Sequence, residues 1–461
     1  MPKNIVIFSD GTGQHSGLFF DESRSNIYKL YRATRCGPDT AIDPAEQLAF
    51  YDPGIGTKLI GGNFFTYLYN FIYNIISQAT GLGLTRNVIE CYAAIIRMWE
   101  PGDRIFLFGF SRGAYTIRCL GGVLALCGIP THMPDGKPLL RDLKTSMRIA
   151  KKAVTQIYQH TASVSQKNAT VRKKELLKQR TLLAERFRKT YGSGDDCESM
   201  VVPYFIGVFD TVASLANPIV MAVLGILVLA LLSGAAGLLS LWSLTWITWA
   251  GCLSVGAIVI CICWYLMAHL KIPGALPGFS PWKTVTFTEW RMKFYDTTLD
   301  ERVRYARHAI SIDEDRKTFP RVIWGALSSS NEPDENGINW FEQFWFAGNH
   351  ADIGGGYPEN EARLSDVALK WMLDAATNVG LKYDPHYMRL YPDPTGPQHD
   401  ERRKLLFRYG GVEQRKILAI ATLHPSVEER FAAPAVLHYD EMKPYRPRAL
   451  RGHEKISHWF V

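Results

Sequence analysis

The sequence predicts an α/β protein with a mostly parallel sheet, interrupted by a basic helical insertion and by a transmembrane helical hairpin. Three observations predict this class. Short apolar strands alternate with helical patterns along the chain, 14 Lys and Arg against three acids fall within residues 141–189, and residues 211–270 contain no Asp, Glu, Lys or Arg. Alternation of strand and helix favours a parallel sheet with helices on both faces.

The individual elements follow from apolar runs and their periodicity. Strands are expected at residues 4–8, 47–51, 104–108, 204–209, 321–325 and 343–347. Helices are expected at residues 26–34, 85–99, 112–126, 299–311 and 363–379. We expect one domain in two halves, residues 1–215 (with the basic insertion at about 141–191) and residues 271–461, separated by the hairpin at residues 216–270.

The hairpin is predicted by two apolar runs, residues 218–232 and 246–267, each near the roughly 20 residues that span a bilayer. Trp246 and Trp249 beside the turn suit a membrane interface. Because a hairpin returns the chain to its starting side, both halves can form one domain, and the basic flanks predict that this domain faces the cytoplasm. A very hydrophobic buried helical pair is the alternative.

Composition limits the partners and the compartment. The net charge of +8 comes largely from the basic insertion, which suits an anionic phospholipid surface, and no nucleic-acid-binding motif is present. The eight cysteines have no metal-binding spacing and are expected to be buried free thiols in a reducing compartment. The uncharged aromatic stretch at residues 59–85 fits an interfacial lid or a buried helix equally well.

A candidate nucleophile lies in the sequence Gly-Phe-Ser-Arg-Gly at residues 109–113. It follows the apolar strand pattern 104–108 and precedes the helical pattern 112–126, so the motif has the strand–turn–helix context of a nucleophile elbow. Ser111 is therefore the predicted nucleophile. The alternative is an ordinary turn with a capping serine.

A serine nucleophile needs a base and an acid that orients it. Asp210 ends one predicted strand and His350 ends another, and open α/β sheets gather their sites at these strand ends. The chain order Ser111, Asp210, His350 is that of α/β hydrolases. Asp352 is the alternative acid and His308 the alternative base, although His308 falls on a helical pattern. His424, in a turn-like context, is a further competitor for the base.

The oxyanion of an acyl-transfer intermediate needs backbone N–H donors. The amide of Arg112 lies at a helix N-terminus, and Asp10, Gly11 and Thr12 follow the first strand, where glycine lets amides face a cleft. An ordinary strand–helix turn is the alternative for this loop. No full set of oxygen ligands accompanies Asp10, so we assign no metal and expect no cofactor.

Several motifs occur in an order that resembles a known family, at residues 8–12, 51–57, 81–84, 106–115, 207–212 and 348–357. Together they resemble the α/β-hydrolase domain of the type VI secretion lipase effectors and their relatives, from about residue 3 to about residue 450. The resemblance implies a serine esterase acting on phospholipid acyl chains, with Ser111 as nucleophile, Asp210 as acid and His350 as base.

The sequence therefore predicts a membrane-anchored serine hydrolase, phospholipase A-like, acting on a membrane phospholipid or another acyl ester. An acyltransferase or thioesterase with the same three residues is the alternative enzyme. A non-catalytic membrane scaffold is the alternative from another class. The sequence does not determine the oligomeric state.

Overall fold

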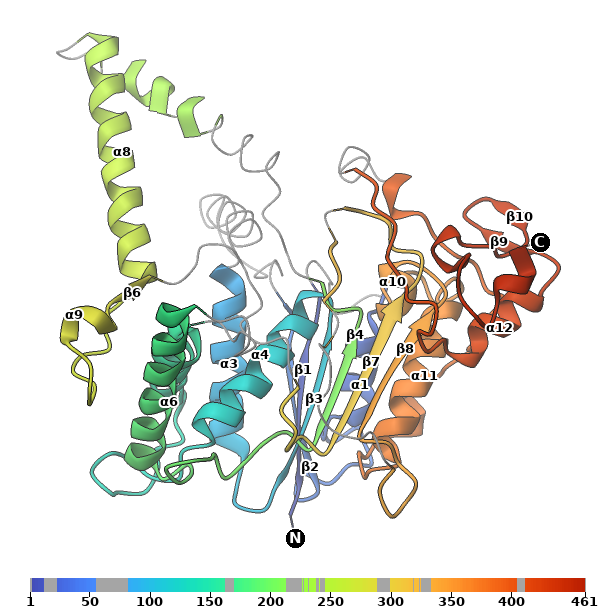
Figure 1. The fold of residues 1–461 in the computed structure, drawn as a ribbon, viewed down its shortest axis with the longest axis horizontal. Coiled ribbons are helices and arrows are strands. Elements are labelled where there is room, and N and C mark those ends of the chain that lie inside the picture. Colours follow the sequence, from blue (N-terminus) through green and yellow to red (C-terminus); the bar gives the residue numbers. More distant parts are fainter. Residues whose placement is uncertain are drawn as a thin grey trace.

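A parallel six-stranded sheet forms the centre of the computed structural model (Figure 1). The model describes residues 2–11, 23–54, 82–161, 170–212, 226, 228–230, 232–237, 240, 245–287, 299–317, 319–322, 324, 333–403 and 411–460. The strands of this sheet are β1 (Asn4–Ser9), β2 (Gln47–Asp52), β3 (Arg104–Phe110), β4 (Phe205–Phe209), β7 (Tyr305–Ser311) and β8 (Phe341–Phe346). Their order is β2-β1-β3-β4-β7-β8, and every neighbouring pair is parallel. The predicted α/β class and mostly parallel sheet are confirmed.

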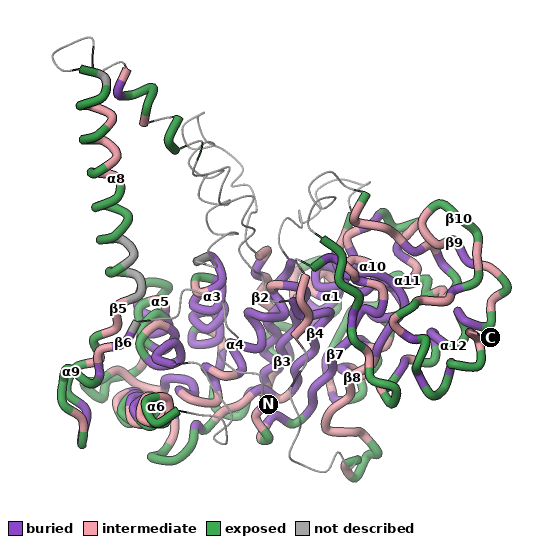
Figure 2. The backbone as a smooth tube through the Cα atoms, turned by 45° about the horizontal axis from the view of Figure 1, so that its top comes forward, coloured by how far each residue is buried: buried purple, intermediate pink, exposed green. Residues whose placement is uncertain are grey.

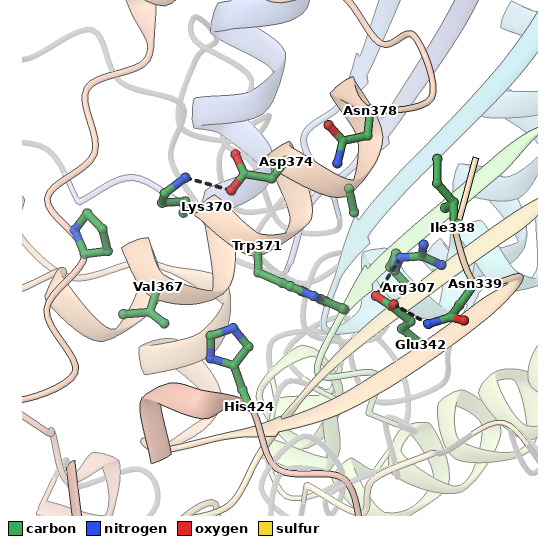
Figure 3. A pocket seen from close by; sticks show the side chains of 13 residues that line it. Arg307, Ile338, Asn339, Glu342, Val367, Lys370, Trp371, Asp374, Asn378 and His424 are labelled. Atoms are coloured by element: carbon green, nitrogen blue, oxygen red, sulfur yellow. Dashed lines mark hydrogen bonds and ion pairs between the residues drawn. The ribbon is translucent and has the colours of Figure 1, made fainter. Parts of the chain in front are cut away.

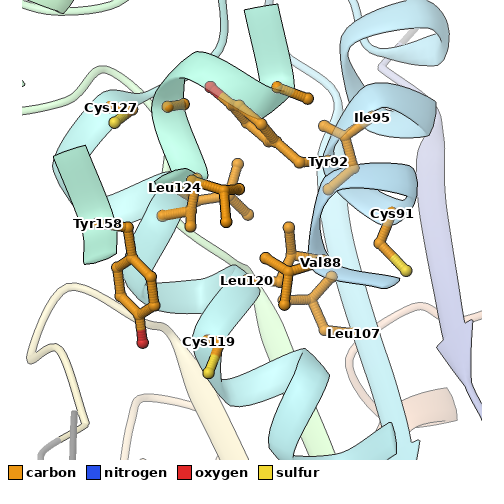
Figure 4. Packing of buried hydrophobic residues seen from close by; sticks show 14 of the residues in the cluster. Val88, Cys91, Tyr92, Ile95, Leu107, Cys119, Leu120, Leu124, Cys127 and Tyr158 are labelled. Carbon is orange, nitrogen blue, oxygen red and sulfur yellow. The ribbon is translucent and has the colours of Figure 1, made fainter. Parts of the chain in front are cut away.

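Alternation along the strands gives the sheet two apolar faces. Ile5 and Leu107 belong to the cluster that packs under α3 (Leu82–Met98), α4 (Arg112–Cys127), α5 (Leu143–Lys152) and α6 (Val171–Tyr191). Figure 4 shows part of this cluster, where Leu107 of β3 lies beneath Val88 and Leu120. Phe8 belongs to the opposite cluster, under α1 (Asn26–Thr34) and α11 (Arg363–Thr377). Strands buried on both faces explain the nearly continuous apolar runs in the sequence.

The strand order has one reversal, and it fixes where a site can form. From β1 the chain moves to β2 on one side, whereas β3 and all later strands add on the other side. The loops after β1 and β3 therefore leave the sheet toward opposite faces, which opens a crevice at their carboxyl ends. The residues after β1 begin at Asp10, and Ser111 follows β3 directly.

Residues far apart in the chain complete the structure around this sheet. The two halves of the chain meet where β4 pairs with β7, although nearly a hundred residues separate them. A third apolar cluster joins the ends of β7 and β8 to α12 (Pro425–Ala432) and to the ribbon of β9 (Val436–His438) and β10 (Glu441–Lys443). His350 lies at the first position of α10 (His350–Gly354), which Asn349 caps.

Two predicted elements differ from the structure. Residues 299–311 were expected to form a helix, but residues 305–311 are strand β7, buried along its whole length. Its position between β4 and β8 overrides the weak helical periodicity of a seven-residue segment. The strand expected at residues 321–325 is present only as an isolated bridge between Arg321 and Val212 in the part that is described.

The predicted transmembrane hairpin is not supported. Its first run, residues 218–232, lies mostly outside the described residues, and its second run forms α8 (Trp246–His269). Figures 1 and 2 show α8 standing away from the sheet with many exposed side chains. A span needs about 20 consecutive apolar helical residues. No helix among the described residues is long and apolar enough to cross a membrane, so the predicted two-helix membrane location facing the cytoplasm is wrong on this finding.

The cysteines are free thiols, as expected, but only some are buried. Cys91 of α3 and Cys119 and Cys127 of α4 are buried in the core (Figure 4). Cys197 and the three cysteines of α8 are exposed, in contrast to the prediction. The three cysteines of α8 are exposed because they lie among other exposed apolar side chains of this helix, such as Val259 and Ile260.

Candidate active site

Ser111 occupies a strained turn between β3 and α4. Its backbone has φ 58° and ψ −120°, a conformation that residues with a side chain rarely adopt. The turn is fixed from outside, because the N–H of Ser111 donates to the carbonyl oxygen of Phe209 at 3.1 Å. Ser111 as a residue is 7% exposed. This is the geometry of the predicted nucleophile elbow.

The two glycines of the motif are required by close backbone contacts. A Cβ added at Gly113 would lie 1.9 Å from the carbonyl oxygen of Ser9, and one at Gly109 would lie 2.6 Å from the carbonyl oxygen of Gly113. Neither position can hold a side chain without moving α4 away from β1 and β3. The sequence pattern therefore reflects packing as well as chemistry.

Asp210 follows β4 and its carboxylate is fully buried. Oδ1 accepts from the N–H of Ser311 at 3.0 Å and from Nη1 of Arg415 at 2.5 Å. Oδ2 accepts from Nη2 of Arg415 at 2.9 Å and lies 2.5 Å from Nδ1 of His350. Burial alone would raise the pKa of Asp210, but the charge of Arg415 and the contact with His350 outweigh it and hold this pKa well below its usual range. Asp210 is therefore ionised when it meets the imidazole.

His350 has one ring nitrogen engaged and one unused. Nδ1 faces the Asp210 carboxylate, so this nitrogen carries the proton in the neutral ring and Nε2 is left as an acceptor. Nε2 is buried and has no hydrogen-bond partner in the described part of the chain. The ring lies between Phe110, with centroids 4.7 Å apart, and Phe319, at 5.2 Å. Because Phe110 precedes Ser111, the ring is packed directly against the elbow.

The structure gives the alternative acid and bases other partners. Asp352 accepts from the N–H of Asn349 at 3.0 Å and lies 2.7 Å from Nδ1 of His399, so it holds the cap of α10 and a different histidine. His308 lies within β7, where its ring contacts Gln343 and Thr211. Burial lowers the pKa of His308 to about 3. His424 caps α12.

The predicted oxyanion loop is only partly described. Gly11 lies close to the elbow, because a Cβ added there would be 3.4 Å from Cβ of Ser111. The N–H of Asp10 donates to the carbonyl oxygen of Asp52, and the N–H of Gly11 donates to Oδ1 of Asp10, so both amides have acceptors in this conformation. Thr12 lies outside the described residues. The amide of Arg112 belongs to the first turn of α4, where N–H groups have no acceptor within the helix.

Sequence reasoning did not identify Arg415, Glu314 or Arg316. Glu314 accepts from the N–H of His350 at 3.2 Å and forms a buried ion pair with Arg316 at 2.7 Å. The charged run Asp-Glu-Asp-Arg at residues 313–316, placed directly after a buried strand, is a signal that could have pointed to this pair. Arg415 comes from a loop with no motif, and no local pattern indicates its contact with Asp210.

Other features of the described chain lie away from this centre. No group of three or more His, Cys, Asp or Glu side chains is arranged to hold a metal ion in the ranges that are described. A cavity of about 420 Å³ lies beside β8 and α11, lined in part by Trp371, His424 and Val367 (Figure 3). It contains none of Ser111, Asp210 and His350.

Several known proteins are similar to this chain over part of their length. A protein of Saccharomyces cerevisiae with no assigned function is 30% identical over 218 residues, which cover 46% of this chain and 27% of the relative. A crystal structure of an uncharacterised Pseudomonas aeruginosa protein is 16% identical, with a TM-score of 0.35, over 85% of this chain and 48% of that one. The Tle1 effector bound to the VgrG spike of the type 6 secretion system is 15% identical, with a TM-score of 0.28, over 79% and 52%.

This chain therefore spans about half or less of the length of these relatives. The family model is that of the catalytic domain of Tle1-like phospholipase effectors of the type VI secretion system, and it matches residues 3–375. Most of the chain is covered by this match, including the strained serine and the aspartate–histidine pair. The chain belongs to the Tle1-like family of type VI secretion phospholipase effectors through its catalytic domain.

Proposed function

We propose that this chain is a serine hydrolase that cleaves the acyl ester bonds of lipids, phospholipase A-like in its chemistry. Family membership supports a phospholipase. The observation that carries the finer proposal is the arrangement of His350, whose Nδ1 is held by Asp210 while Nε2 has no hydrogen-bond partner among the described residues. The ring of His350 also packs against Phe110, the residue before the strained Ser111, and a base held in this way near a serine is what serine nucleophiles require.

In the first half of the proposed reaction, Oγ of Ser111 attacks the acyl carbonyl carbon and its proton passes to Nε2 of His350. The imidazolium that forms is stabilised by the ionised Asp210, which remains a carboxylate throughout. The carbonyl oxygen becomes an oxyanion, and the N–H of Arg112 is the proposed donor for it. Collapse of the tetrahedral intermediate breaks the ester bond, and the leaving alkoxide takes the proton from His350.

In the second half, water attacks the acyl-enzyme. His350 removes a proton from the water, and the released fatty acid leaves Ser111 with its proton restored. The amides of Gly11 and Asp10 contribute to the oxyanion site only if the loop after β1 changes conformation, because both have acceptors in this structure. The amide of Thr12 is the remaining predicted donor in this loop.

The test is hydrolysis of phospholipid vesicles by the purified chain, with lysolipid and fatty acid quantified by mass spectrometry. We expect Ser111→Ala to lower turnover by roughly 10⁴-fold or more while the fold is kept. Reaction of Ser111 with a fluorophosphonate probe is the matched readout, because it reports the nucleophile without a lipid. Wild-type turnover by folded Ser111→Ala protein would refute the assignment, and acyl transfer to an added alcohol in preference to water would indicate a transferase instead.

A further inference from the structure

We infer that Arg415 is a positioning residue of this site. Arg415 holds the Asp210 carboxylate toward His350 and compensates the negative charge of Asp210 before the reaction begins. The inference rests on the proposed function and adds a residue from outside the predicted set of three. It concerns how the carboxylate of the acid is oriented and which positive group compensates its charge.

The contacts of Arg415 fix the carboxylate in one orientation. Its guanidinium donates through Nη1 to Oδ1 and through Nη2 to Oδ2 of Asp210, at 2.5 and 2.9 Å. Nη1 also donates to the carbonyl oxygen of Ser311 at 3.0 Å, while the N–H of the same serine donates to Oδ1. Two-pronged pairing of this kind sets the plane of a carboxylate as well as its distance. Oδ2 is therefore presented to Nδ1 of His350.

Arg415 is buried and comes from a distant part of the chain. It is 8% exposed and lies more than two hundred residues after Asp210 in the sequence. The ion pair between Arg415 and Asp210 is therefore shielded from water. An exposed ion pair, by contrast, would contribute little to stability or orientation. A buried guanidinium that meets the acid of a proposed active site on both oxygens acts on the orientation and charge of that acid.

The charges around His350 are arranged in pairs, and Arg415 belongs to one of them. Asp210 and Glu314 are the negative groups, and Arg415 and Arg316 are the positive ones, each carboxylate being paired with one guanidinium. Arg321, in the described segment 319–322, adds a further positive charge near Arg415. His308, on the adjacent strand, is held neutral by burial, which lowers its pKa.

This pairing has a consequence for the base. Without Arg415, Asp210 would lose the positive group that contacts both of its oxygens, so a protonated His350 would be favoured more than in the wild type. With Arg415 present, the carboxylate is compensated before the imidazole takes a proton. The physical effect of Arg415 on Asp210 is consistent with this, because its charge lowers the pKa of the carboxyl despite burial.

The test separates charge from geometry with two substitutions. Arg415→Gln removes both, and Arg415→Lys keeps the charge but loses the two-pronged contact. We would measure kcat/KM on a soluble short-chain ester between about pH 4 and pH 9, and the titration of the His350 ring by NMR with isotope-labelled histidine. Arg430→Gln is the matched control, since Arg430 is also a buried arginine of the C-terminal part but donates to the carbonyl oxygens of Pro394 and Gly396.

For Arg415→Gln we expect the acidic limb of the profile and the His350 titration midpoint to move up by about one pH unit. The plateau of kcat/KM should fall by about 100-fold because the acid is no longer oriented. For Arg415→Lys we expect kcat/KM to fall about tenfold. The His350 titration midpoint of this variant should stay within roughly 0.3 pH units of the wild type. Arg430→Gln should leave the midpoint in place. The Asp210→Asn/Arg415→Gln double variant should match Asp210→Asn alone, because Arg415 acts through Asp210.

An unchanged or lowered midpoint in Arg415→Gln, an equal shift in Arg430→Gln, or multiplicative losses in the double variant would each overturn the inference. If Arg415→Gln does not fold, Arg415→Lys decides, and wild-type kcat/KM in that variant would refute the positioning role. If the wild-type chain hydrolyses no ester, the proposed function fails, and the His350 titration alone decides whether Arg415 controls the charge of this pair.

Discussion

Gly113→Ala tests the contact that places the serine elbow against the sheet. A methyl group at this position would lie 1.9 Å from the carbonyl oxygen of Ser9 and 2.6 Å from that of Asp10, both backbone atoms that cannot rotate away. Carbon–oxygen contacts are normally about 3.3 Å or longer, so the first turn of α4 must move by roughly 1.4 Å from β1. Ser111 precedes this turn directly and should move with it.

A displacement of about 1 Å at a reacting group lowers turnover by about 100-fold. Overpacking should also lower the free energy of unfolding by about 1–3 kcal/mol, offset by no more than about 1 kcal/mol from the better helix propensity of alanine. Ester hydrolysis, fluorophosphonate labelling and denaturant unfolding measure the three effects.

Gly121→Ala, in the same helix, is the control for this experiment. A Cβ there would lie 3.3 Å from Cδ1 of Ile206, the end of a flexible side chain, so activity and stability should stay close to those of the wild type. Wild-type labelling and stability in Gly113→Ala would show that α4 and β1 are not in the contact described here, and the account of the elbow would be refuted.

The remaining predictions concern the carboxylates and the alternative base. Asp210→Asn should lower kcat/KM by about 10⁴-fold. Asp352→Asn should keep kcat/KM within about tenfold but lower the free energy of unfolding by about 1–3 kcal/mol. An inactive, well-folded Asp352→Asn protein would contradict this assignment. Burial raises the pKa of Asp52 to about 6 from its ordinary 3.8, so its contribution to stability is fully present below about pH 4 and is lost as the pH rises through about 6. The stability of the wild type relative to Asp52→Asn should therefore fall by about 2–3 kcal/mol between pH 4 and pH 7 in urea unfolding, and a pH-independent difference would disprove it. His308→Gln should keep kcat/KM within about threefold, because within the described residues the ring nitrogens of His308 contact Gln343 and Thr211 and not Ser111 or Asp210. A loss comparable to that of His350→Gln would show that the wrong base was chosen.

Local sequence predicted most of the sheet because its strands are buried on both faces. The runs at residues 4–8, 47–51 and 104–108 correspond to β1, β2 and β3 within one or two residues. The segment at 299–311 was misassigned because a short buried strand and a short helix have similar apolar content. Only the pairing of β7 with β4 and β8 distinguishes them.

The sequence by itself determined the strand–turn–helix around Ser111, since the glycines and the apolar strand before them are local requirements. It also indicated that Asp210 and His350 end strands. Which side chains meet at those ends was decided by the strand order, because β4 lies between β3 and β7 and the end of β8 brings His350 onto Asp210. Arg415 could not be foreseen, since its contact with Asp210 joins segments with no shared pattern and arises only when the chain after β8 folds back over the sheet. Short-range physics therefore determined the nucleophile's turn, and long-range packing decided which charges surround the base.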